Sequence, residues 1–235
     1  MKYLNTYENK SFNLKSLTSY KNDSFNMKPM SSYITEYIVK KKLDKFIDSE
    51  HNYKYFPETK EELIANIKEL LSKGEINLNY IDTHNITDMS HLFETLNIST
   101  NIDVSNWDVS NVTNMDSMFA GRTKFDCNLS KWDVSKVENM KNMFSWCSNF
   151  TGKGLENWNV SNVTNMRYMF GECNKFKGKS IENWDVSKVE DMSYMFEYCT
   201  RLNCNLNNWN ISNVKKKTGI FQGTKGIKNK TSWYK

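Results

Sequence analysis

One pattern of apolar and polar positions recurs along most of the chain. The nine residues that begin at Trp107 read WDVSNVTNM, and close variants begin at Trp132, Trp158 and Trp184, with a weaker one at Trp209. Successive tryptophans lie 25 or 26 residues apart. Self-similarity at one fixed period of this length is the sequence signature of a repeat protein.

A further copy precedes the first tryptophan. The segment 81–89 fits the same frame and begins 26 residues before Trp107. In every copy a phenylalanine lies 12 residues after the initial Ile or Trp, at Phe93, Phe119, Phe144, Phe170, Phe196 and Phe221. The pattern therefore defines six copies over residues 81–224.

Nine apolar positions recur within a copy. In the third copy they are Leu129, Trp132, Val134, Val137, Met140, Met143, Phe144, Cys147 and Phe150. The first three read L-x-x-W-x-V, the apolar frame of a leucine-rich-repeat strand. The segment 140–147 has apolar residues at i, i+3, i+4 and i+7, which predicts a short helix with one face toward the core. Each copy is thus expected to contain a strand, a loop and a short helix.

A single copy buries too little apolar surface to fold alone. Nine inward side chains at roughly 1.5–3 kcal/mol each offset only part of an ordering cost near ~1.5 kcal/mol per residue. Stacking on both neighbours buries the remaining flanks. We therefore predict an α/β fold, a leucine-rich-repeat-like solenoid of six strand–loop–short-helix copies with an N-terminal capping helix.

Residues 57–80 carry the signals of that cap. Thr59 and Glu62 form a T-x-x-E capping box before a run of periodic apolar residues, and Gly74 is a helix stop. The segment 76–80 alternates apolar and polar residues, which predicts a short strand. We expect residues 57–80 to cover the open face of the first copy.

The two ends of the chain differ from the repeats. Residues 1–56 are polar and are expected to be partly disordered, with a candidate helix at 32–48 and no assigned role. Lys215, Lys216 and Lys217 replace the usual Thr-Asn-Met, so the last copy is polar where nothing stacks upon it. Residues 225–235 are predicted to be a basic, solvated tail.

Charge and hydropathy exclude two classes of partner. The formal net charge is +5, but residues 215–235 hold seven lysines and no acid, while residues 81–214 are mildly acidic. A nucleic-acid-binding protein carries its Lys and Arg residues on the folded recognition surface, so no nucleic-acid partner is expected here. The chain has no apolar run long enough for a membrane span, and no apolar segment follows the N-terminus as in a signal peptide. A cytoplasmic location is the resulting expectation.

On these residues the chain resembles the Bacteroides surface antigen A-like (BspA-like) leucine-rich-repeat proteins, in the variant found in mycoplasmal lipoproteins. The motif W-D-V-S-N-V-T-N-M-x-x-M-F-x-x-C-x-x-F is matched in the segment 158–176, with Asn159 in place of the Asp. The resemblance implies a leucine-rich-repeat-like solenoid with a non-enzymatic and often cell-surface binding role. Some relatives are adhesins for host proteins. The Asn that follows the strand in classical repeats is a Val here.

The residues on either side of each tryptophan form the candidate partner-binding face. They are Asn106, Asp108, Lys131, Asp133, Asn157, Asn159, Asn183, Asp185, Asn208 and Asn210. Solenoids bind partners on such extended faces. The competing interpretation is that these polar residues support turns and recur because the repeat was duplicated. We expect a monomer that binds a protein partner of unknown identity. The alternative is a surface adhesin or structural protein that contacts host matrix.

The other candidate chemistries are weaker. An exposed tryptophan column would be a platform for sugars, but the central apolar slot of the frame favours burial. The cysteines share the repeat period and lack zinc-type pairs, so we expect buried free thiols. The repeated Asp residues lack a calcium-loop motif. No catalytic motif surrounds the three histidines, so we expect no enzyme activity, no metal and no cofactor.

Overall fold

The computed structural model describes residues 52–96, 98–227 and 231–234. The chain divides into two units, Met1–Glu50 and His51–Lys235, and the description below concerns the second. The helix predicted at 32–48 lies outside the described residues. Within the described part the only α-helix is α4 (Lys60–Ser72), and two short 3-10 helices follow, η3 (Leu155–Asn157) and η4 (Lys179–Ile181).

Helix α4 has the two ends that the sequence predicts. The hydroxyl of Thr59 accepts the N–H of Glu62 at 3.2 Å, and the Glu62 carboxylate accepts the N–H of Glu58 at 2.7 Å. At the other end Gly74 has a φ of 75°, and the N–H groups of Gly74 and Glu75 return to carbonyls of the last helical turn. This is a Schellman motif, which satisfies carbonyls that the helix leaves free. The predicted capping box and glycine stop are confirmed.

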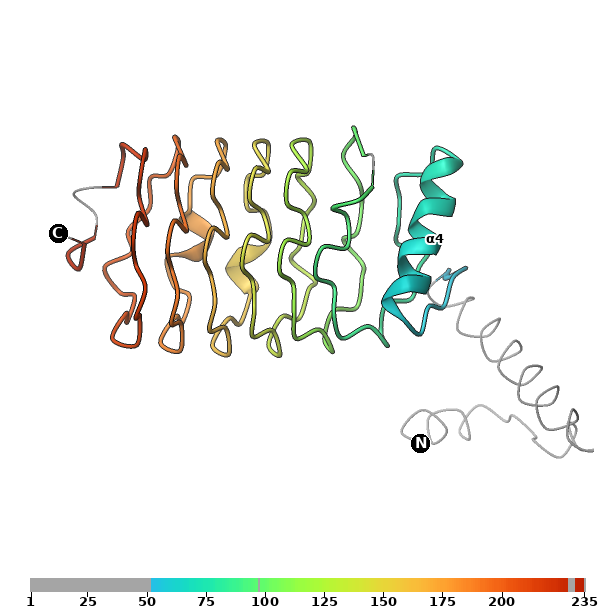
Figure 1. Ribbon diagram of the computed structural model, residues 1–235, viewed down its shortest axis with the longest axis horizontal. Helices are drawn as coiled ribbons and strands as arrows, with labels where there is room; N and C mark the ends of the chain where they lie inside the picture. The colour runs from blue at the N-terminus through green and yellow to red at the C-terminus, as the bar shows by residue number, and fades with distance from the viewer. Residues whose placement is uncertain (1–51, 97, 228–230, 235) are drawn as a thin grey trace, which may run out of the picture. The chain divides into compact units, whose positions relative to one another are not determined.

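One face of α4 packs against the first copy. Leu63 and Ile67 are fully buried and Leu70 is 4% exposed, and all three belong to the same apolar cluster as Leu78 and Phe93. Figure 1 shows α4 beside the first coil of the repeat region. The helix therefore lies where the predicted N-terminal cap was expected.

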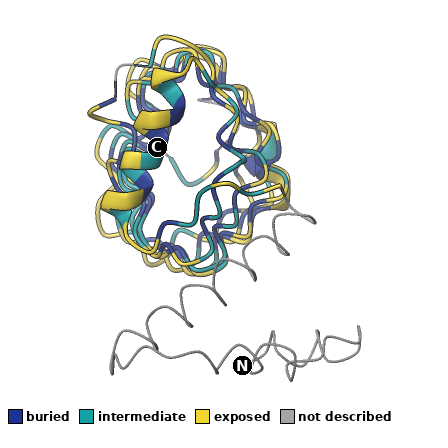
Figure 2. Cartoon of the chain, turned by 90° about the vertical axis from the view of Figure 1, so that its right-hand side faces the viewer, coloured by how far each residue is buried: buried dark blue, intermediate teal, exposed yellow. Residues whose placement is uncertain are grey.

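Consecutive copies lie side by side along the repeat region (Figure 1). A column of isolated parallel bridges joins equivalent residues of successive copies, Asp88, Asn114, Asn139, Asn165, Asp191 and Lys216. Viewed along the stack, the coils superimpose closely (Figure 2). Repetition in the sequence thus appears as repetition in space, with each copy contacting its neighbours.

The predicted strands are wrong. The described residues contain isolated bridges but no regular strand. In the third copy the N–H of Trp132 donates to the carbonyl of Leu129 at 3.1 Å, which closes a four-residue turn where a strand was expected. In the segment 76–80 only Asn77 forms a bridge, and Ile76 is 46% exposed. The L-x-x-W frame therefore marks a turn whose first and last side chains face the core.

The predicted short helix inside each copy is also wrong. The segment 140–147 consists of two consecutive turns, Met140–Met143 and Phe144–Cys147, closed by hydrogen bonds of 3.2 and 2.9 Å between their last N–H and first carbonyl. The third residues, Asn142 and Trp146, have φ values of 54° and 63°. Positive φ at that position is typical of type II turns and excludes an α-helix. Two adjacent turns produce the same i, i+3, i+4, i+7 spacing as a helix.

Bonds between copies explain why a helix does not form. In the segment 140–147 alternate N–H groups donate to carbonyls of the next copy at 2.8–3.0 Å: Met140 to Asn165, Asn142 to Arg167, Phe144 to Met169 and Trp146 to Gly171. These donors are unavailable to an α-helical ladder. Equivalent bonds recur in the second, fourth and fifth copies and all point toward the next copy.

The interior is the predicted one. All nine apolar positions of the third copy are at most 3% exposed. The phenylalanine rings of successive copies are nearly parallel, with centroids 5.7 Å apart for Phe119 and Phe144 and 5.8 Å apart for Phe144 and Phe170. The structure is therefore held by one large aromatic cluster, with little regular secondary structure around it.

The C-terminal residues are not the solvated tail that their lysines predict. Ile227 is fully buried, Thr231 is 4% exposed, and the rings of Trp233 and Tyr234 contact Phe221. The indole N–H of Trp233 donates to the carbonyl of Leu206 at 2.8 Å, as earlier tryptophans donate one copy back. These residues cover the last phenylalanine of the stack. The sequence contained a signal for this arrangement, because Trp233 follows Trp209 by 24 residues, close to the repeat period.

Candidate functional site

The ten residues of the candidate face all lie in the described part of the chain. Nine are exposed and Asp108 is half-buried. The tryptophans between them are 2–5% exposed, and each indole N–H donates to a backbone carbonyl of the preceding copy, as Trp158 does to Leu129 at 3.1 Å. The tryptophan column is thus core, as predicted, and the sugar-platform interpretation does not fit it.

The five residues that follow the tryptophans support turns. Each side-chain oxygen accepts the backbone N–H two residues further on at 3.0–3.1 Å, in Asp108, Asp133, Asn159, Asp185 and Asn210. These are Asx-turns, in which the side chain replaces a backbone partner. Hydrogen bonds from Ser187 lower the pKa of Asp185 below its usual value. For these five positions the turn-supporting interpretation has direct geometric support.

The residues that precede the tryptophans have no such shared contact. Lys131 donates to the side-chain oxygen of Asn106 at 2.6 Å. Within the described residues the side chains of Asn157, Asn183 and Asn208 have no hydrogen-bond partner, although all three are exposed. They occupy equivalent positions in three consecutive copies. We call these three residues the amide column, and its carboxamide donors and acceptors face solvent.

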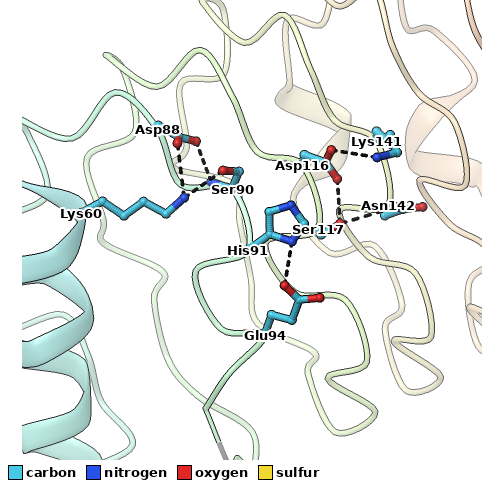
Figure 3. A network of polar contacts seen from close by, with 9 residues as sticks. All are labelled: Lys60, Asp88, Ser90, His91, Glu94, Asp116, Ser117, Lys141 and Asn142. Carbon is cyan, nitrogen blue, oxygen red and sulfur yellow. Dashed lines mark hydrogen bonds and ion pairs between the residues drawn. The ribbon is translucent and has the colours of Figure 1, made fainter.

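A polar network that the sequence did not predict joins α4 to the repeats (Figure 3). The ammonium of Lys60 contacts Asp88 at 3.2 Å and the hydroxyl of Ser90 at 2.8 Å. Burial alone would raise the pKa of Asp88, but hydrogen bonds from Ser90 and Lys60 lower it below its usual value. In the next copies Lys141 pairs with Asp116 at 3.1 Å. The contacts of Lys60 thereby tie helix α4 to the first copy.

A second feature missed by the sequence analysis is a basic hollow near the last copies. It has a volume of about 640 Å³ and is lined by Arg167, Ser193, Tyr194, Lys215, Lys216, Lys217 and Thr218. The lining contains four cations and no carboxylate. The ring of Tyr194 stacks on that of Tyr168 with centroids 4.7 Å apart. These residues are far apart along the chain, and only the stacking of three successive copies brings them together.

The cysteines are core residues, as predicted. All five are buried, and none is joined in a disulfide. The thiols of Cys147, Cys173 and Cys199 donate to a phenylalanine carbonyl of the preceding copy at 2.8–3.0 Å, and Thr224 takes the same position and bond in the last copy. Burial raises the pKa of the Cys127 thiol to about 12 and that of Cys173 well above its usual value. Reactive thiols have lowered pKa values, so these groups are structural.

We expect the buried thiols to make the fold sensitive to alkali. The folded state keeps each proton while the unfolded state loses it above pH ~8.5, so stability is present below that pH and is lost as the pH rises. Raising the pH from 7 to 9.5 should cost about 1.4 kcal/mol for each thiol whose pKa is raised. Urea unfolding at several pH values measures this, and Cys173→Thr, which copies the natural Thr224, should show a smaller loss. Equal pH dependence in both proteins would contradict the assignment.

The described residues contain neither a cluster of metal ligands nor a membrane-spanning helix. Within 52–96, 98–227 and 231–234 no group of three or more His, Cys, Asp or Glu side chains could hold a metal ion. No helix in the same part of the chain is long and apolar enough to cross a membrane.

Stacked copies of one motif around a shared core, with polar side chains outside, define a repeat protein. The chain belongs to the family described as Mycoplasma protein of unknown function, DUF285, whose pattern matches twice, at residues 65–153 and 142–235. Comparison with curated proteins and with solved structures returned no match. The two family matches together span most of the second unit.

Proposed function

We propose that this chain is a non-enzymatic protein-binding scaffold that presents the face beside its tryptophans to a partner protein. The observation that carries the proposal is the amide column. Asn157, Asn183 and Asn208 repeat at equivalent positions, are exposed, and have no partner within the described residues. Side chains that support the fold are hydrogen-bonded inside it, as their neighbours after each tryptophan are.

We assign the scaffold to the leucine-rich-repeat-like solenoids, in the BspA-like variant. The parallel bridges between copies and the buried Leu-Trp-Val frame support this assignment. The copies replace the strand and helix of that class with consecutive turns. A stack of this kind fixes the backbone positions that carry the amides, which lowers the conformational-entropy cost of binding a partner.

The chemistry of the amide column favours a polypeptide partner. A carboxamide offers both donors and an acceptor, which matches the paired N–H and C=O groups of a peptide backbone. The carboxamides carry no charge, so a small ion would gain little binding energy from them. The neighbouring Lys131 and Asp133 add one charge of each sign at the edge of the face.

The test removes the amide column from the full chain. A partner is first captured on the immobilised protein and identified, and its affinity is then measured for N157A/N183A/N208A. We expect binding at least about tenfold weaker, because three contacts on one surface are lost. The control K124A/K175A/R201A alters three exposed side chains at another repeated position and should bind within about twofold. Equal binding by the amide-column variant would overturn the proposal.

A further inference from the structure

The last copy ends in a row of unpaired backbone donors. In the inner copies four alternate N–H groups donate to the next copy, as Met192, Tyr194, Phe196 and Tyr198 donate to residues 216–222 at 2.7–2.9 Å. The equivalent donors of the last copy are Lys217, Gly219, Phe221 and Gly223. Within the described residues none of these four N–H groups has a hydrogen-bond acceptor. We call residues 215–223 the open edge.

The two ends of the stack are treated differently. At the first copy, helix α4 packs on the core and Lys60 binds Asp88 and Ser90 (Figure 3). At the last copy, residues 231–234 pack on the ring of Phe221 and donate to Leu206 and Asn207. Within the described part they give no hydrogen bond to the open edge. The core is therefore covered while the edge stays available.

The charge around the open edge is positive. The basic hollow described above is lined by Lys215, Lys216, Lys217 and Arg167 and by no carboxylate. Two of these lysines have acidic neighbours outside the lining, since Lys215 lies 2.9 Å from Glu190 and Lys216 lies 4.0 Å from Asp191. Within the described residues Lys217 and Arg167 have no ion-pair partner. The unpaired N–H groups add partial positive charge of the same sign.

We propose that the open edge binds an acidic polypeptide segment of a partner protein. Main-chain carbonyls of that segment accept from the row of N–H groups, and its carboxylates contact Lys217 and Arg167. At the four interfaces that follow the second to fifth copies, the same four donors bind peptide carbonyls, which is why a polypeptide fits better than a small anion. Addition of a chain to an unpaired edge is an established mode of peptide recognition. The site does not depend on the amide column.

The first test is an affinity measurement on the full chain. The probe is a fluorescein-labelled decapeptide of alternating Glu and Thr, followed by fluorescence anisotropy. We expect K215Q/K216Q/K217Q to bind it about tenfold or more weakly, because opposite charges next to the row are lost. The control K124Q/K136Q/K188Q removes the same charge from exposed lysines of other copies and should stay within about twofold. Equal losses in the two variants would overturn the proposal.

The second test reads the backbone row directly. Hydrogen exchange of residues 215–223 should slow when the peptide binds, since the free N–H groups gain acceptors. Binding without added protection, or equal binding of dextran sulfate, would show attraction of charge alone and reject the polypeptide site. Equal binding of the same peptide with Gln for Glu would show that the site does not require an acidic segment.

Self-association through this end, abolished in K215Q/K216Q/K217Q, would show that the occupant is a second copy of this chain and not a partner protein. Variant N157A/N183A/N208A should bind the probe normally.

Discussion

Alanine at position 158 is expected to lower the free energy of unfolding by about 3–5 kcal/mol. The ring of Trp158 is 5% exposed and stacks between Trp132 and Trp184 at 6.2 Å on each side. Its indole N–H also donates to the carbonyl of Leu129 at 3.1 Å, so truncation leaves a cavity and an unpaired buried acceptor. Urea denaturation followed by circular dichroism measures the loss.

Two companion variants separate packing from chemistry at this position. Trp158→Phe retains most of the ring and should cost less than alanine, with the lost hydrogen bond as the main term. Trp146→Ala removes a tryptophan that is 60% exposed and should change stability by no more than about 0.5 kcal/mol. If Trp158→Ala were as mild as Trp146→Ala, the ring would not be a core residue and the stacked arrangement would be wrong.

The second large effect concerns Gly154, where Gly154→Ala is expected to cost roughly 2–5 kcal/mol. Its φ is +88°, a conformation that costs a side chain about 1–2 kcal/mol. A Cβ there would lie 2.2 Å from the backbone nitrogen of Ser130 in the preceding copy. Backbone cannot rotate away, so the two copies must separate locally. Thermal and urea unfolding of the variant measure the loss.

Gly121 provides the matched control for that prediction. It has a similar φ of +75°, but a Cβ at Gly121 meets nothing within 4 Å. Gly121→Ala should therefore show only the conformational cost of about 1–2 kcal/mol. The difference between the two variants isolates the close approach between copies. Equal losses would mean that copies three and four do not pack as tightly here as described.

The sequence predicted the repeat, its period and its buried positions correctly. Buried side chains were identified because a copy repeated six times shows which positions always stay apolar. The caps of α4 were also predictable, since Thr59, Glu62 and Gly74 act through local hydrogen bonds that residue type determines. Of the ten residues of the candidate face, nine are exposed and Asp108 is half-buried.

Local structure inside the copies was predicted wrongly for a definite reason. Apolar residues at i, i+3, i+4 and i+7 fit both a helix and two adjacent turns. The choice depends on where the N–H groups find acceptors. In the segment 140–147 half of them find carbonyls in the next copy, and positive φ at Asn142 and Trp146 directs them there. No single copy contains that information.

The candidate sites follow the same division. The sequence identified polar residues beside each tryptophan, but only the structure separated Asp133 and Asp185, which hold turns, from the unpaired amides of Asn157 and Asn183. The open edge was invisible in the sequence, because an unpaired N–H is defined by the absence of a neighbouring chain. The sequence by itself determined which side chains are buried and how the copies repeat. The tertiary structure decided the backbone conformation and the free donors, since both depend on hydrogen bonds between residues 25 or 26 positions apart.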